Sequence, residues 1–370
     1  MTKNEFIARI AAGLSSLPPE EIHRTISYFD EMIQDRMEEG TPEEEAVRSI
    51  GDPDVIASEI LSETEEMKTR EEDPEIVTAR KRRTYETDGA ELTSIRAVDG
   101  DTKIEVIPSA DGRIRIHHTV LPRLDYIFKQ GSGVLSVTKR DQRRWYERMR
   151  PSLLSGADHL VIEVPGTSSL SLFLKTSNST ITVRDISAGE LTGVTGNGRF
   201  LFERVTSKGK IDLKTTNGPV TVTECTAGGT LSCLTANGRV MFSSAAAEKI
   251  FAGTTNAPMI FDRVTSDGAF TAETSNGKIV AETVKAGNLL SLHSSNGSIR
   301  FSGLRFEKTL EAVTSNGTIE GVLSGSAKDY SYHCHTTNGK CTLPEEMKIG
   351  EKEVRLRTSN GSICVTFEES

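Results

Sequence analysis

Ten asparagines recur at nearly constant intervals along the second half of the chain, and nearly all of them precede a glycine. The intervals are 19 or 20 residues and lengthen to 22 in the last two steps. The positions are Asn178, Asn197, Asn217, Asn237, Asn256, Asn276, Asn296, Asn316, Asn338 and Asn360. A period this regular is typical of a solenoid, because each repeat supplies one coil and the coils stack.

Apolar side chains alternate with other residues on both sides of each asparagine. In the repeat at Asn316, Leu310 and Ala312 stand six and four residues before the asparagine, and Ile319 stands three residues after it. Most other repeats are apolar at these positions, and a threonine or serine always stands two residues before the asparagine. An alternation with period two predicts strands with one face turned inward.

Two architectures fit a strand, an Asn-Gly bend and a second strand. One is a meander of two-residue β-hairpins. The other is a solenoid, which is favoured because the same kind of side chain recurs at the same register in each repeat. We expect a mainly β protein, a single-stranded β-solenoid that is β-helix-like, with coils of about 20 residues behind an N-terminal four-helix α module. The asparagines should stack as an amide ladder at a bend that uses their tolerance of unusual backbone angles.

The sequence divides into four segments. Residues 1–62 are an acidic helical module, and residues 63–83 are a charged linker or helix extension. Residues 84–165 form an irregular β entry region with a basic insertion, and residues 166–370 hold the regular solenoid of about ten Asn-Gly coils. In the helical module, Thr2 and Glu5 have the spacing of a capping box at the start of a helix.

Two family resemblances accompany this division. Residues 1–62 resemble the HAAS signalling domain of bacteria, through Asn4-Glu5-Phe6, Leu17-Pro18-Pro19-Glu20-Glu21, Gly40-Thr41-Pro42-Glu43-Glu44 and Ile50-Gly51-Asp52-Pro53. This resemblance implies a signalling or partner-binding role. Residues 90–368 resemble the putative-adhesin β-strand-repeat family, a bacterial family of unknown function, through the Thr-Ser-Asn-Gly-x-Ile core at residues 314–319 and 358–363.

The charge of the chain is uneven. Its net charge is -9, but residues 1–73 alone hold 7 Lys+Arg and 20 Asp+Glu, a balance of -13. An acidic module repels phosphates, so nucleic acid is an unlikely partner. No apolar run approaches the roughly 18 residues that span a bilayer, and the start of the chain lacks a signal-peptide pattern. We therefore expect a cytoplasmic protein without a transmembrane segment, with peripheral membrane contact as an option.

A basic insertion precedes the regular repeats and carries the single tryptophan of the chain. Its candidate interaction residues are Arg143, Arg144, Trp145 and Tyr146. Arginines beside aromatic rings suit an anionic surface, either nucleic acid or lipid headgroups. Alternatively, the insertion folds back on the solenoid, with Trp145 and Met149 packing against it. The second interpretation is favoured because one insertion is not a charged face.

Catalytic, cofactor and metal sites are not predicted. Five cysteines without a Cys-x-x-Cys pair argue against a disulfide framework or a zinc site. Cys225, Cys233, Cys334 and Cys341 fall on inward rows, whereas Cys364 faces outward. The alternation also sends His333 and His335 outward on either side of Cys334, so these three residues do not converge on a metal. Paired carboxylates of the kind a glycosidase needs are not evident on the outward rows.

One outward row is apolar. Four residues after five consecutive asparagines stand Leu201, Thr221, Met241, Ile260 and Val280. An exposed apolar row usually marks a contact surface. We expect protein to cover it, either another part of the chain or a second molecule through self-association.

These observations predict a non-catalytic bacterial scaffold. Its helical module would dock to a regulatory or envelope-stress protein, and its solenoid would offer a rigid interaction surface. The alternatives are a surface adhesin-type stalk that binds a ligand and a polysaccharide-active β-helix protein.

Overall fold

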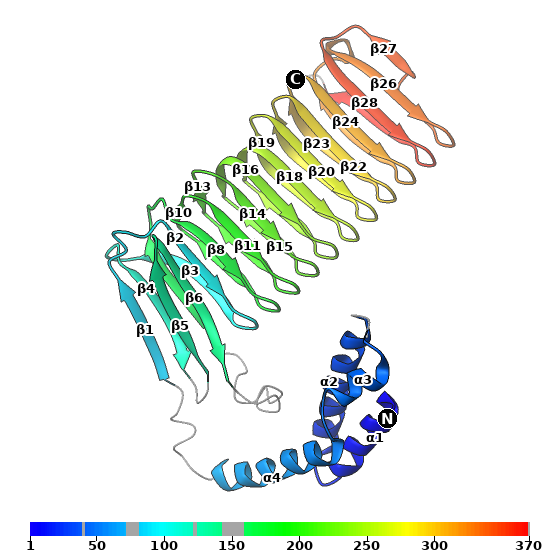
Figure 1. Cartoon of the computed structure of the whole chain (residues 1–370). Coiled ribbons are helices and arrows are strands. Elements are labelled where there is room, and N and C mark those ends of the chain that lie inside the picture. The colour runs from blue at the N-terminus through cyan, green and yellow to red at the C-terminus, as the bar shows by residue number, and fades with distance from the viewer. Residues whose placement is uncertain (39–40, 72–80, 121–123, 143–158, 369–370) are drawn as a thin grey trace. The chain divides into compact units, whose positions relative to one another are not determined.

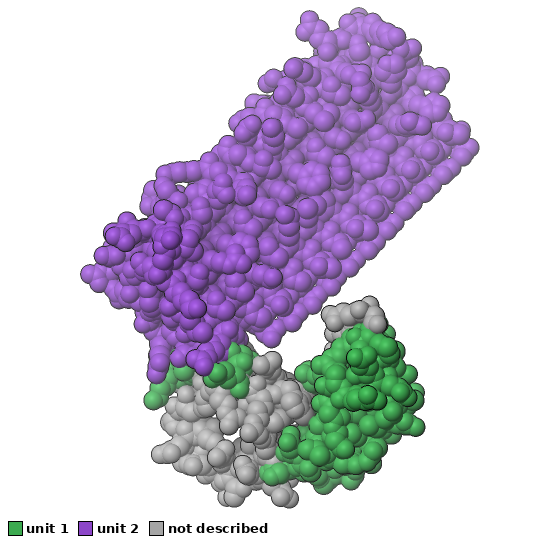
Figure 2. Space-filling view, in the orientation of Figure 1, with its two compact units in different colours: residues 1–81, 120–124, 141–157 green, residues 82–119, 125–140, 158–370 purple. Residues whose placement is uncertain are grey.

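The computed structural model describes residues 1–38, 41–71, 81–120, 124–142 and 159–368 (Figure 1). The chain divides into two compact units, residues 1–81, 120–124 and 141–157 in the first and residues 82–119, 125–140 and 158–370 in the second (Figure 2). The first unit contains the α-helices, and the second contains the strands and a short 3-10 helix. Each unit has its own hydrophobic core.

The helical unit contains two long helices, α2 (Pro19–Glu38) and α4 (Pro53–Glu71), and the shorter α1 (Lys3–Gly13) and α3 (Glu43–Arg48). The capping box predicted at Thr2 is confirmed, because Thr2 accepts a hydrogen bond from the Glu5 backbone and the Glu5 carboxylate accepts one from the Thr2 backbone. Phe6, Phe29 and Ile33 are buried in the core, with the Phe6 and Phe29 rings 5.5 Å apart edge to face.

The described residues of the second unit form one sheet of 29 strands. The strands of the entry region are β1 (Lys81–Thr87), β2 (Ser94–Val98), β3 (Lys103–Ser109), β4 (Ile114–Val120), β5 (Leu124–Gly131), β6 (Val134–Asp141) and β7 (His159–Pro165). The first regular strands are β8 (Ser171–Lys175), β9 (Ile181–Arg184), β10 (Ser187–Ala188), β11 (Leu191–Val194), β12 (Phe200–Glu203), β13 (Thr206–Ser207), β14 (Ile211–Lys214), β15 (Val220–Thr223), β16 (Thr226–Leu234), β17 (Val240–Ser243), β18 (Ala246–Thr254) and β19 (Met259–Ser266). The remaining elements are β20 (Ala269–Thr274), β21 (Ile279–Ala286), β22 (Leu289–Ser294), β23 (Ile299–Phe306), β24 (Thr309–Thr314), β25 (Ile319–Ser324), the 3-10 helix η2 (Ala327–Asp329), β26 (Tyr330–Thr336), β27 (Glu346–Lys348), β28 (Lys352–Thr358) and β29 (Ile363–Glu368).

Strands of successive repeats pair in parallel and in register. Leu191 of β11 lies beside Ile211 of β14, and Phe200 of β12 lies beside Val220 of β15. A meander of hairpins would pair neighbouring strands antiparallel, so this pairing identifies the solenoid. Its regular part comprises about nine turns, stacked along one direction (Figure 1). The inward side chains of all coils form one continuous core, as the alternation predicts.

The coils at both ends of the stack do not follow the order of the sequence. At one end, β2 lies between β6 and β8, and β3 lies between β7 and β9. At the other end, β28 lies between β24 and β26 (Figure 1). The first and last coils along the chain are therefore both covered by another coil. Antiparallel strands follow on the outside, with β4 beside β7 and β27 beside β26. Covered edges of this kind hinder strand addition from another molecule.

The Asn-Gly bend depends on close stacking and not on unusual backbone angles. Neither the ten asparagines nor the glycines that follow them have a positive φ, which corrects the expectation from the sequence. A Cβ on Gly218 would lie 1.7 Å from the carbonyl oxygen of Gly198 in the adjacent coil, so a side chain does not fit. Thr215 completes the turn: its hydroxyl accepts from the Gly218 N–H at 3.1 Å and lies 3.3 Å from the Gly198 oxygen.

Backbone strain appears instead at the corner seven residues after the asparagine. Residues at this position in seven successive coils have φ between 50° and 60°. They are Asp185, Arg204, Glu224, Ser244, Arg263, Thr283 and Gly303. A left-handed residue costs about 1–2 kcal/mol unless it is glycine. The kink turns the chain so that the next residue, such as Val284, is buried in the core.

Replacing a turn glycine tests the close stacking. We expect Gly218→Ala to destabilise the solenoid by about 2–3 kcal/mol, because the methyl group forces two coils apart. The measurement is the urea midpoint of unfolding followed by circular dichroism. Gly100→Ala is the matched control and should change stability by less than about 0.5 kcal/mol, since no atom lies within 4 Å of its added Cβ. Equal effects of the two substitutions would contradict the stacking explanation.

Relieving a corner tests the strain. Thr283→Gly should stabilise the protein by about 1 kcal/mol, because a β-branched residue is least suited to positive φ. Gly303→Ala is the reciprocal change and should destabilise by a similar amount, since its added Cβ has only ordinary contacts at 3.5 Å and more. Both are measured by denaturant unfolding. Destabilisation by Thr283→Gly would show that the side chain matters more than the backbone.

Candidate functional site

The apolar outward row predicted from the sequence exists as one stacked stripe. We call Leu201, Thr221, Met241, Ile260 and Val280 the apolar stripe. These five residues are adjacent in five successive coils, in the order Leu201, Thr221, Met241, Ile260, Val280. All five side chains are half-buried. The stripe ends at buried Thr182 on one side and at exposed Arg300 on the other.

Charged residues line the two sides of the apolar stripe. Two residues before it in the sequence lies a basic row, formed by Arg199, Arg239 and Lys278. Two residues after it lies an acidic row, formed by Glu203, Asp262 and Glu282. Alternation along a strand places all three rows on the same outward face. An apolar stripe between opposite charges has the composition of a protein contact surface.

The asparagine ladder is confirmed, and it occupies the polar groups of the repeat. The Nδ2 of each asparagine from Asn197 onward donates to the Oδ1 of the adjacent asparagine at 2.6–2.7 Å. Asn178 begins the ladder by donating to the Asp101 carboxylate at 2.8 Å. The stacking order at the far end is Asn316, Asn360, Asn338. Because each amide binds its neighbour, the ladder is structural and leaves few groups for a ligand.

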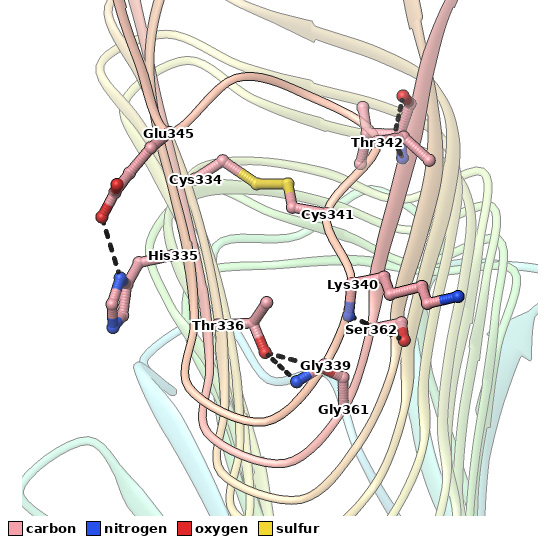
Figure 3. Close-up of a disulfide and its surroundings, with 11 residues drawn as sticks. Cys334, His335, Thr336, Gly339, Lys340, Cys341, Thr342, Glu345, Gly361 and Ser362 are labelled. Carbon is pink, nitrogen blue, oxygen red and sulfur yellow. Dashed lines mark hydrogen bonds and ion pairs between the residues drawn. A yellow bond between two sulfur atoms is a disulfide. The ribbon is translucent and has the colours of Figure 1, made fainter.

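A disulfide joins Cys334 and Cys341, which corrects the inference from the odd number of cysteines (Figure 3). Cys334 stands four residues before Asn338 and Cys341 three residues after it, so both occupy inward positions of one coil. The coil brings the two sulfurs together across its interior, which a search for Cys-x-x-Cys spacing does not detect. Two inward cysteines in the same repeat are the signal that could have predicted the bond.

The other described cysteines lie elsewhere. Cys225 and Cys233 are buried and unpaired, and Cys364 is exposed as predicted. Burial raises the pKa of Cys225 to about 11, and it raises the pKa of Cys233 further. Both thiols therefore stay protonated at neutral pH and are poor nucleophiles.

A shallow depression of about 640 Å³ lies on the other sheet face near the C-terminal end. His293, His333, His335, Arg355 and Arg357 contribute to its lining. Two of the histidines face carboxylates, with His333 at 3.6 Å from Glu346 and His335 at 3.3 Å from Glu345. No group of metal-ligating side chains converges anywhere in the described residues. His333 therefore pairs with an acid at the start of β27, and His335 pairs with the acid just before that strand.

The predicted contact residues of the basic insertion, Arg143, Arg144, Trp145 and Tyr146, lie outside the described residues. Just before them, Lys139 lies 3.4 Å from the buried Asp99 carboxylate. Asp99 also accepts from the Tyr126 hydroxyl and from the backbone of Thr102. This buried network fixes β6 and β5 to the loop after β2, so it has a structural role.

Comparison with known proteins defines the family. A model of the Toastrack DUF4097 family matches residues 92–366. The chain belongs to the Toastrack DUF4097 family. The HAAS family model matches residues 5–59 of the same chain. Both matches confirm the resemblances inferred from the sequence. No curated protein matches the chain, and no helix among its described residues is long and apolar enough to cross a membrane.

Solved structures similar to this Toastrack chain carry adhesion names. The "putative adhesin" of Parabacteroides distasonis ATCC 8503 is 12% identical with a TM-score of 0.38, and the match covers 65% of this chain and 96% of that one. The "putative adhesin" of Bacteroides fragilis NCTC 9343 is 13% identical with a TM-score of 0.32, over 65% and 97%. The "putative cell adhesion protein" of Clostridium sporogenes ATCC 15579 is 10% identical with a TM-score of 0.21, over 78% and 100%.

Reduction tests the contribution of the disulfide. A bond that closes a short loop contributes about 2 kcal/mol by restricting the unfolded chain. We expect Cys334→Ser with Cys341→Ser to lower the urea midpoint under oxidising conditions, and a reductant to give the unsubstituted protein the same midpoint. Cys364→Ser is the control and should have no effect, because Cys364 is exposed and unpaired. An unchanged midpoint in the double variant would show that the terminal coil holds without the bond.

Proposed function

We propose that this Toastrack protein is a non-catalytic scaffold in which the helical module docks to a protein partner and the solenoid presents a rigid interaction surface. The HAAS match at residues 5–59, joined to the solenoid, carries the proposal. The polar groups that recur along the solenoid bind one another, and its repeated hydroxyls bind the backbone of the next coil. Such groups hold the coils together and leave the non-repeated surfaces for recognition.

The partner of the helical module should present basic groups. Residues 1–73 have a balance of -13 between basic and acidic residues. Glu44, Glu45 and Glu59 are exposed on α3 and α4 and are available for contact. Opposite charges across an interface accelerate association and select the partner. We assign the partner to a regulatory or envelope-stress system, located in the cytoplasm or at the inner membrane surface.

A second candidate is an adhesin-type stalk outside the cytoplasm. The Cys334–Cys341 disulfide favours it, because disulfides persist in oxidising compartments and are rare in the cytosol. A polysaccharide-active protein is the third class, and a glycan hydrolysis and lyase screen addresses it. Fractionation of cells with a blot for the full chain separates the first two classes. Protein outside the cytoplasm would exclude the cytoplasmic scaffold.

Charge reversal on the helical module tests the docking proposal. We expect the full chain to capture a specific protein, and Glu44→Lys with Glu45→Lys and Glu59→Lys to reduce that capture at least about tenfold. Glu248→Lys with Glu307→Lys, on exposed solenoid positions, is the control and should capture normally. Circular dichroism checks that the helices still fold. Equal capture by both variants would place the docking surface elsewhere.

A further inference from the structure

On the outward face that bears the apolar stripe, basic residues lie on one side of the stripe and acidic residues lie on the other. In the coil of Asn197, Arg199 precedes the stripe residue Leu201 by two positions and Glu203 follows it by two. In the coil of Asn276, Lys278 and Glu282 flank Val280 in the same way. The two flanking positions in a coil are about 13 Å apart along the strand, with the stripe midway between them.

We propose that this face binds a second copy of the same chain, as a parallel dimer whose twofold axis runs along the apolar stripe. Rotation about that axis exchanges the two sides of the stripe while keeping each coil at the same height. The basic row of one copy then faces the acidic row of the other, and opposite charges meet at the same height in the coils of Asn197 and Asn276. Arg199 meets the partner copy's residue 203, Lys278 meets residue 282, and each stripe residue meets its own equivalent.

The antiparallel alternative has the opposite electrostatics. In this arrangement the twofold axis lies in the interface, perpendicular to the stripe. The basic row of one copy then faces the basic row of the other copy, and the two acidic rows also face each other. Like charges at a contact surface cost free energy and suppress that arrangement. The order of charges across the stripe therefore selects the parallel orientation.

The charged groups are available for this contact. Within the part of the chain that the structure describes, no ion pair involves Arg199, Glu203, Lys278 or Glu282. Asp262 instead pairs with Arg263 in its own coil at 2.7 Å. The stripe extends over five coils, about 19 Å at strand spacing. A surface of this size is at the small end of specific interfaces, so we expect a dimer that forms at concentrations on the order of micromolar.

This inference deepens the proposed function by naming a second copy as the occupant of the solenoid surface. It does not depend on the protein that the helical module binds. A chain that stays monomeric would refute the dimer and leave capture by the helical module intact. Loss of capture would refute the docking proposal and leave the dimer intact.

Row reversal tests the pairing in the full chain. Arg199→Glu with Lys278→Glu places acid opposite acid in the coils of Asn197 and Asn276, and we expect the dimer dissociation constant from analytical ultracentrifugation to rise at least about tenfold. Adding Glu203→Lys and Glu282→Lys exchanges the charges across the stripe in these two coils and should restore the constant to within about threefold. Arg305→Glu with Lys308→Glu, exposed outside this face, should leave it unchanged. A monomer at all concentrations, or a dimer insensitive to the first variant, would overturn the proposal.

The exposed thiol of Cys364 tests the orientation, because it lies on the same outward row, beside Glu320. In the parallel dimer Cys364 faces its equivalent, and a short bismaleimide should link two chains. Arg300 and Glu320, which lie on the row between the stripe and Cys364, neutralise each other in an ion pair at 2.8 Å. In an antiparallel dimer centred on Met241 the two thiols are ten coils apart, about 48 Å, and no link forms. Cys364→Ser should abolish the link, and Met241→Glu, checked for folding by circular dichroism, should reduce it at least about tenfold by charging the stripe. Dimers in solution without cross-linking would overturn the parallel orientation.

Discussion

Coil-to-coil contact at the Asn-Gly bend is the interaction on which the rest of the solenoid depends. Because glycine has no side chain, the turn of one coil can lie directly on a backbone carbonyl of the adjacent coil. Gly218 lies in this way on the carbonyl of Gly198. The threonine hydroxyl beside it satisfies the glycine N–H, and the asparagine amide binds the next asparagine. These three groups set the register of the coils that carry an Asn-Gly pair. Once the register is fixed, the inward apolar side chains form one continuous core.

The same stacking explains why strain is tolerated at the corner. Six coils place a residue other than glycine at positive φ, at a cost of about 1–2 kcal/mol each. The kink lets the following side chain enter the core, and burial of an aliphatic side chain contributes about 1.5–3 kcal/mol. Burial therefore offsets the strain in the coils where this side chain is Ile186, Val205, Val264 or Val284. The same balance between strain and burial recurs along the stack, because each coil is stabilised mainly by contacts with its two neighbouring coils.

Repetition also separates structural residues from recognition surfaces. Groups that recur in every coil, such as Asn217 and Thr215, are engaged with adjacent coils. The features that do not recur lie outside this ladder: the helical module, the terminal disulfide and the apolar stripe with its charged sides. A rigid stack with a few distinct surfaces suits a protein that holds partners at fixed positions. This division is the basis for both the scaffold and the dimer proposals.

Much of the fold follows from the sequence, because a period of about 20 residues places equivalent side chains at equivalent heights. The repeat determined the solenoid, its inward rows, the asparagine ladder and the position of the apolar stripe, and the N-terminal motifs determined the HAAS resemblance. Only the tertiary structure decided the order of coils at the two ends, where β2 and β28 each lie between coils from other parts of the chain. It alone joined Cys334 to Cys341 and placed the strain at the corner. The physical reason is that the sequence period determines which side chains lie side by side in adjacent coils of the regular part. At the two ends, the order of the coils depends on which coil can cover an exposed strand edge.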